Sequence, residues 1–164
     1  MKFLFFDFDG TLADTSLGIY KAFNIATEKN NLTPPSYYLF KKQIGPPISK
    51  IIRNIFPGIN DYLLSNIILV FREVYDNDTF RLLDWYSCVE DTLTIIKSKY
   101  NIKFAVITNK PTKTCTKIIQ SNKSLDGIFE NVFGIDFRKN SGKDDFLSKA
   151  DCLRFALDYF SINS

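Results

Sequence analysis

The sequence predicts an α/β protein with a parallel sheet as its core and a set of helices inserted after the first strand. Three observations predict it. The apolar run 2–6 opens the chain as a buried strand. Helical periodicity then fills about residues 16–82, and helix and strand alternate over 83–164. Such alternation is typical of parallel sheets, so 1–15 and 83–164 form the predicted Rossmann-like core and 16–82 a helical insertion.

The elements follow in order from apolar periodicity and from the breaks between periodic segments. The insertion predicts four helices, separated by Pro, Gly and Asn: 16–30, 37–44, 48–56 and 60–78. The second half predicts helices at 89–99, 112–121 and 149–160, strands at 103–107 and 131–136, and a polar loop at 137–144. Asn60 and Ser148 are the expected N-caps of their helices, because their side chains can accept bonds from first-turn N–H groups.

Composition sets the class of protein. The chain has 164 residues, of which 45% are hydrophobic and 24% charged, as expected of a globular domain. A net charge of +3 is too small to indicate nucleic acid, and no apolar stretch is long enough to cross a membrane. The three cysteines show no metal-ligand spacing, so we expect buried thiols and a reducing, cytoplasmic location.

The sequence contains no histidine. This excludes Ser-His-Asp and Cys-His catalysis as well as histidine-ligated zinc. Acid–base chemistry therefore falls to carboxylates, lysine, tyrosine or cysteine.

Two carboxylates, Asp7 and Asp9, follow the first strand directly and precede Gly10. Their desolvation and mutual repulsion both cost free energy. One interpretation is purely structural: Asp9-Gly10 is a turn, and Asp7 binds backbone N–H groups. A second strand that ends in Thr108-Asn109 favours a functional interpretation of the combined pattern.

These motifs resemble those of a known family. FLFFDFDGTLADT is similar to the opening motif of phosphatases in the haloacid dehalogenase superfamily. KFAVITNKP resembles the second motif in the phosphoglycolate phosphatase branch, and the helical insertion resembles that branch's cap domain. IGPPISKIIRNIF is similar to its Gly-x-Pro segment, which faces substrate. The resemblance covers essentially the whole chain.

The resemblance implies a mechanism. Asp7 is the expected nucleophile, which forms an aspartyl-phosphate. Asp9 is the expected general acid and base, and its main-chain carbonyl joins the Asp7 carboxylate in binding Mg²⁺. The phosphate-binding residues implied are Gly10, Thr108 and Asn109.

A lysine that neutralises the phosphate is also implied, and two candidates remain. Lys149 opens the last predicted helix, whose N-terminus favours an anion, and we prefer it to Lys143 in the preceding loop. Either lysine read alone is a solvated surface residue. In the cap, Gly45, Pro46 and Pro47 are the expected substrate-facing segment, although Gly-Pro-Pro is equally a plain helix breaker.

The family's fourth motif, Gly-Asp-x-x-x-Asp or similar, has no counterpart in these 164 residues. Magnesium needs anchoring carboxylates, so we expect weak Mg²⁺ binding and impaired activity. The strand that carries this motif would pair with 2–6. We therefore expect 2–6 at a sheet edge, where the chain self-associates or is protected by other elements. Three interpretations stay open: the chain is a fragment of a longer enzyme, a partner covers this edge, or catalysis has been lost.

The leading functional hypothesis is a Mg²⁺-dependent phosphomonoester hydrolase acting on a small phosphorylated metabolite. One alternative is a non-catalytic phosphate-binding or interaction protein that keeps the fold. Another is a phosphosugar mutase of the same superfamily. A dehalogenase is disfavoured, because dehalogenases of the superfamily lack an acid–base aspartate at the position of Asp9.

Overall fold

The computed structural model describes residues 2–141 and 144–162. The chain forms two compact units, here called the sheet unit (Met1–Ala13 and Trp85–Ser164) and the helical unit (Asp14–Asp84). The sequence placed the two boundaries after residue 15 and after residue 82. Whether the helical unit acts as a cap stays a prediction.

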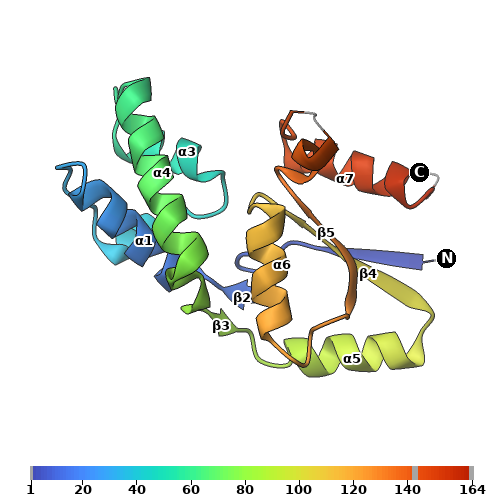
Figure 1. The fold of residues 1–164 in the computed structure, drawn as a ribbon. Coiled ribbons are helices and arrows are strands. Elements are labelled where there is room, and N and C mark those ends of the chain that lie inside the picture. Colours follow the sequence, from blue (N-terminus) through green and yellow to red (C-terminus); the bar gives the residue numbers. More distant parts are fainter. Residues whose placement is uncertain (1, 142–143, 163–164) are drawn as a thin grey trace. The chain divides into compact units, whose positions relative to one another are not determined.

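The sheet unit is built on three parallel strands, which confirms the predicted fold class (Figure 1). Their order is β1 (Lys2–Phe6), β4 (Ile102–Thr108), β5 (Phe129–Gly134). Phe6 lies opposite Val106 and Thr108 opposite Gly134, so the strands end at a common edge. Polar residues that follow the three strands are therefore brought together there.

Helices cover both faces of this sheet. α5 (Val89–Lys99) and α6 (Thr112–Ser121) are the crossovers to β4 and β5. Both crossovers move in the same direction across the sheet, from β1 to β4 and from β4 to β5. Right-handed connections therefore place α5 and α6 on the same face. α7 (Lys149–Tyr159) packs on the other face, where Cys152 and Ala156 join Ala105, Ile107 and Phe133 in a buried cluster.

The predicted strands differ from the observed ones at their ends. β4 is one residue longer at each end than the predicted 103–107, and β5 begins and ends two residues before the predicted 131–136. The predicted loop 137–144 contains a 3-10 helix, η2 (Phe137–Ser141). Ser148 caps α7 as predicted, since its side chain accepts a bond from Asp151 N–H.

β1 lies at an edge of the three-stranded sheet, which confirms the predicted edge position within the described residues. The expectation that 2–6 is a buried strand is wrong, because all five of its residues are partly exposed or exposed, with Leu4 at 40%. An unpaired strand edge can pair with a strand of another molecule. Self-association through this edge stays a prediction. We expect sedimentation velocity to show concentration-dependent association of the wild type and less of it for Leu4→Lys. A wild type that remains monomeric at all concentrations would contradict the prediction.

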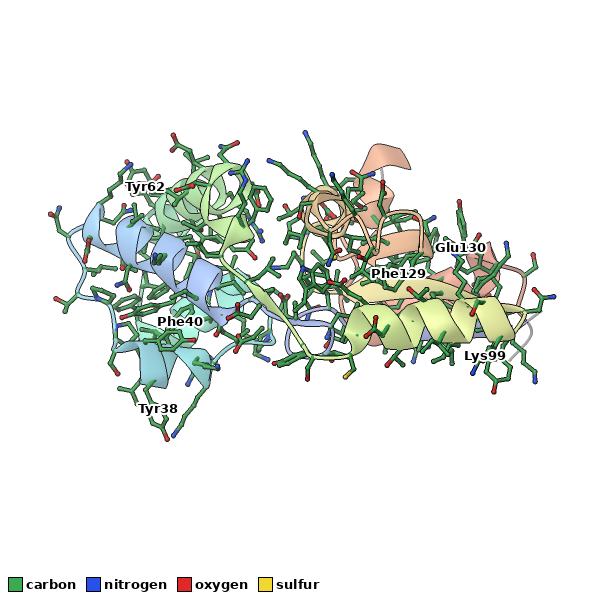
Figure 2. All side chains as sticks on the ribbon, turned by 90° about the horizontal axis from the view of Figure 1, so that it is seen from below. Tyr38, Phe40, Tyr62, Lys99, Phe129 and Glu130 are labelled. Atoms are coloured by element: carbon green, nitrogen blue, oxygen red, sulfur yellow. The ribbon has the colours of Figure 1, made fainter. Side chains whose placement is uncertain are left out.

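The helical unit contains four α-helices and the 3-10 helix η1 (Thr79–Arg81) in its described part. The helices are α1 (Ser16–Glu28), α2 (Tyr37–Lys41), α3 (Ile48–Ile55) and α4 (Asp61–Asn77). Asn60 caps α4 as predicted, with its side chain accepting from Leu63 N–H. Figure 2 shows Phe40 directed into this unit and Tyr38 directed outward, in accord with their exposures of 0% and 67%.

Two short strands, β2 (Ala13–Asp14) and β3 (Asp84–Trp85), were not predicted. They pair in a two-stranded sheet where the chain passes from one unit to the other and back. Two residues are too few for any alternation of apolar and polar side chains to be seen in the sequence. In the described residues no helix is both long enough and apolar enough to span a membrane.

The start of the helical unit is held by a polar network around Asp14. Its carboxylate accepts bonds from Lys41 Nζ at 2.8 Å, Ser16 Oγ at 2.5 Å and Ser16 N at 3.0 Å. The Ser16 hydroxyl also lies 2.6 Å from the Tyr37 hydroxyl. The bond from Lys41, followed by that from Ser16, lowers the pKa of Asp14 to about 2.

This pKa predicts a pH-dependent contribution to stability. Asp14 is more acidic folded than unfolded (where its pKa is about 3.9), so its contribution is present above pH 4 and is lost as the pH falls through about 2. We expect Lys41→Met to lower the midpoint of urea unfolding slightly at pH 6, with the difference shrinking toward pH 2. The control is Lys21→Met, which removes an exposed lysine of α1. A difference that does not depend on pH would contradict this account.

Candidate active site

The candidate site is the edge of the sheet unit where β1, β4 and β5 end. Asp7 and Asp9 follow β1, Thr108 ends β4, and Asp136 lies two residues beyond β5. The parallel register brings these strand ends together although they are separated by about a hundred residues in sequence. The sequence predicted Asp7, Asp9 and Thr108 at this edge and overlooked Asp136.

Asp7 is held by its own loop and by α7. Its Oδ1 accepts a bond from Phe8 N–H at 2.8 Å, and its Oδ2 is paired with Lys149 Nζ. Both side chains are about one-third exposed, so the pair can be reached by a ligand. Lys149 is the first residue of α7 and was the preferred candidate for the phosphate-neutralising lysine. Lys143, the second candidate, lies outside the described residues.

Asp9 is paired with a different lysine. Lys110 Nζ lies 3.1 Å from Asp9 Oδ1, and the side chains are 4% and 17% exposed respectively. Lys110 lies within the stretch KFAVITNKP, and no role was predicted for it. The sequence feature that could have indicated a role for Lys110 is its position directly after Thr108-Asn109 at the end of a predicted strand.

Thr108 is buried, and its Oγ1 accepts a bond from Lys110 N–H at 3.1 Å. While it accepts this bond, the Thr108 hydroxyl keeps its own hydrogen, which it can donate to a phosphoryl oxygen. Gly10 adopts φ +76°, and its N–H donates to Ala13 O at 2.9 Å, so that group closes the turn. Phosphate binding by Gly10, Thr108 and Asn109 stays a prediction.

The loop that carries Lys110 is fixed by the end of β5. Lys110 O accepts a bond from Ile135 N–H at 3.3 Å. Asp136 Oδ1 accepts from Thr112 N at 2.7 Å and from Thr112 Oγ1 at 2.9 Å, so Asp136 caps the start of α6. Gly134 makes this approach possible, because a Cβ there would lie 2.3 Å from Thr112 N and 2.5 Å from Lys110 O.

We predict that Gly134→Ala is strongly destabilising. The two nearest atoms that the added methyl group would meet belong to the backbone and cannot rotate away, so we expect a loss of about 3 kcal/mol, the upper end for overpacking. Urea unfolding measures it. Gly127→Ala is the control, since that position has open space and only a positive φ, at a cost of about 1 kcal/mol. Equal losses in the two variants would show that the close approach is unimportant.

The cysteines do not provide a nucleophile in the sheet core. Burial raises the pKa of the Cys115 thiol well above its usual range and that of Cys152 to about 12. Such thiols stay protonated and are inert. Cys88 is exposed, so the expectation that all three are buried is wrong. It precedes α5 with φ 67°, a backbone conformation that sequence patterns do not reveal.

The donors at this edge suit a hard cation only in part. A carboxylate of Asp7 and the main-chain carbonyl of Asp9 are the oxygen ligands that Mg²⁺ prefers. Within residues 2–141 and 144–162, however, no group of three or more acidic or cysteine side chains is placed to hold a metal. Mg²⁺ bound here would keep several waters or take phosphate oxygens as its remaining ligands.

Comparison with known proteins agrees with this geometry. Residues 4–150 match the family model described as haloacid dehalogenase-like hydrolase. The chain belongs to the haloacid dehalogenase-like hydrolases. No curated protein matches it.

Solved structures show the same fold as this haloacid dehalogenase-like hydrolase. A predicted phosphatase from Clostridium acetobutylicum superposes with a TM-score of 0.85 at 24% identity, covering 99% of this chain and 72% of that one. A putative haloacid dehalogenase-like hydrolase from Bacteroides fragilis gives 0.83 at 20% identity, with coverages of 98% and 73%. A predicted phosphoglycolate phosphatase from Haemophilus somnus gives 0.78 at 22% identity, with coverages of 99% and 72%.

One predicted part of the site lies in the other unit. Gly45, Pro46 and Pro47 belong to the helical unit, between α2 and α3. Pro47 is the residue that precedes α3. Their orientation toward substrate stays a prediction.

Proposed function

We propose that this haloacid dehalogenase-like hydrolase is a Mg²⁺-dependent phosphomonoesterase that acts on a small phosphorylated metabolite. The observation that carries the proposal is the pair of carboxylates after β1, each matched to a lysine, beside the Thr108 hydroxyl at the end of β4. Carboxylates and cations arranged around a hydroxyl donor suit transfer of a dianionic phosphoryl group.

In the proposed reaction Asp7 is the nucleophile. Its carboxylate oxygen bonds to phosphorus, the ester P–O bond breaks, and the leaving oxygen takes a proton from Asp9. Water then attacks the aspartyl-phosphate and gives a proton to Asp9. This hydrolysis releases phosphate and restores the Asp7 carboxylate.

Lys149 serves the phosphate in this proposal. It is partly exposed and contacts Asp7, so it can turn from the carboxylate to a phosphoryl oxygen when substrate binds. Thr108 donates its hydroxyl hydrogen to another phosphoryl oxygen. Mg²⁺ held by Asp7 and the Asp9 carbonyl would neutralise phosphate charge when bound.

Phosphoglycolate is the first substrate to test, because two of the similar solved structures carry that name as predicted or putative phosphatases. A non-catalytic phosphate-binding protein is the second candidate. It is favoured by the small number of acidic side chains available for a metal in the described part of the chain.

We predict that the wild type releases phosphate from phosphoglycolate and p-nitrophenyl phosphate only with Mg²⁺, and that Asp7→Asn lowers turnover on the order of 10³-fold or more. The amide cannot form the covalent intermediate. Phosphate release and acid-trapped phosphoenzyme are the measurements. Asp126→Asn, which removes an exposed carboxylate of the sheet unit, is the control and should change neither.

Two other outcomes decide against parts of this proposal. Substantial turnover by Asp7→Asn would assign the nucleophile to another residue. Binding of phosphate by the wild type without any turnover, measured by calorimetry, would favour the non-catalytic alternative.

A further inference from the structure

Lys110 is an unusual lysine. Lysine is almost never fully buried unless its charge is paired. Here the side chain is 4% exposed, and its ammonium nitrogen lies 3.1 Å from Asp9 Oδ1. The residue therefore places its charge on the carboxylate to which the proposed function assigns the proton transfers.

The backbone of Lys110 is fixed on both sides. Its N–H donates to Thr108 Oγ1 at 3.1 Å, and its carbonyl accepts from Ile135 N–H at 3.3 Å. Pro111 follows with φ −57°, directly before α6. A buried side chain on a fixed backbone has few alternative conformations, so the position of its ammonium group is well defined.

The two lysines of the site, Lys110 and Lys149, differ in exposure and in the carboxylate that they contact. Lys149 is about one-third exposed and pairs with Asp7, where a phosphate can reach it. Lys110 is enclosed and pairs with Asp9. A bound phosphate can therefore contact Lys149 directly, whereas Lys110 contacts the carboxylate of Asp9.

We propose that Lys110 is a positioning residue that binds Oδ1 of Asp9 and thereby presents Oδ2 to the leaving-group oxygen. The inference rests on the proposed function. As the ester P–O bond breaks, its electron pair stays on the leaving oxygen, and the proton moves there from Oδ2. In the second step Oδ2 takes a proton from the attacking water. Lys110 keeps its own protons throughout.

The leaving group gives the test. An alkyl ester such as 2-glycerol phosphate needs a proton on its departing alkoxide, whereas p-nitrophenolate leaves without one. We expect Lys110→Met to lower kcat/KM for 2-glycerol phosphate by about 10- to 100-fold and for p-nitrophenyl phosphate by less than about threefold, since general acid catalysis contributes roughly 10²- to 10⁴-fold. The value of kcat/KM reports the step in which the leaving group departs.

A double variant tests whether Lys110 acts through Asp9. Asp9→Asn alone should show the same dependence on leaving group, and adding Lys110→Met should lower its kcat/KM no further. Lys113→Met is the matched control, because Lys113 is an exposed lysine on α6 three residues away, and it should leave both substrates unchanged.

Equal losses on the two esters, or an additive loss in the double variant, would overturn the proposal. If Lys110→Met does not fold, Lys110→Arg replaces it: the charge is kept and the donor geometry changes, so we expect a smaller loss confined to the alkyl ester.

A crystal structure of Lys110→Met provides a readout that does not depend on turnover. We expect Asp9 to adopt a different rotamer, or several, when Lys110 is replaced, and an unchanged single rotamer would overturn the positioning role. If the wild type hydrolyses neither ester, the proposed function fails, and the rotamer of Asp9 still decides the role of Lys110.

Discussion

Two carboxylates two residues apart at the end of the edge strand β1 need opposite charge within a few ångströms, because their repulsion and desolvation otherwise oppose folding. The sheet unit supplies that charge from two directions. Lys110 reaches Asp9 from the end of β4, and Lys149 reaches Asp7 from the start of α7. The charge balance of the site therefore depends on β4 pairing with β1 and on α7 packing against the sheet.

The same edge shows how a sheet fixes a loop. β4 separates β5 from β1, yet the residues that follow β5 bind the Lys110 carbonyl and cap α6 through Asp136. Gly134 permits both contacts, since any side chain there would meet backbone atoms. The geometry of Asp9 thus depends on a glycine more than a hundred residues away in sequence.

Much of the site could be predicted because its signals are local. Asp7 and Asp9 directly follow an apolar strand, and Lys149 follows the N-cap Ser148 at the start of a helix. These features can be seen within a few residues. The parallel core followed likewise from the alternation of helical and apolar segments.

The remaining features depend on contacts between distant segments. Lys110 is buried and paired with Asp9, whereas a lysine in sequence is by default an exposed residue. β5 ends before Ile135 and Asp136 because their polar groups bind the loop after β4 and the start of α6. Hydrophobic periodicity contains no information about either contact.

The small β2–β3 sheet has a consequence for how such a protein can change. The chain departs for the helical unit at Ala13–Asp14 and returns at Asp84–Trp85, and these two segments are paired neighbours. An inserted segment whose two ends are adjacent can be lengthened, shortened or exchanged for another module, because the distance between its two attachment points does not change. Recombination at this junction could therefore pair the same catalytic core with a new inserted module in one step.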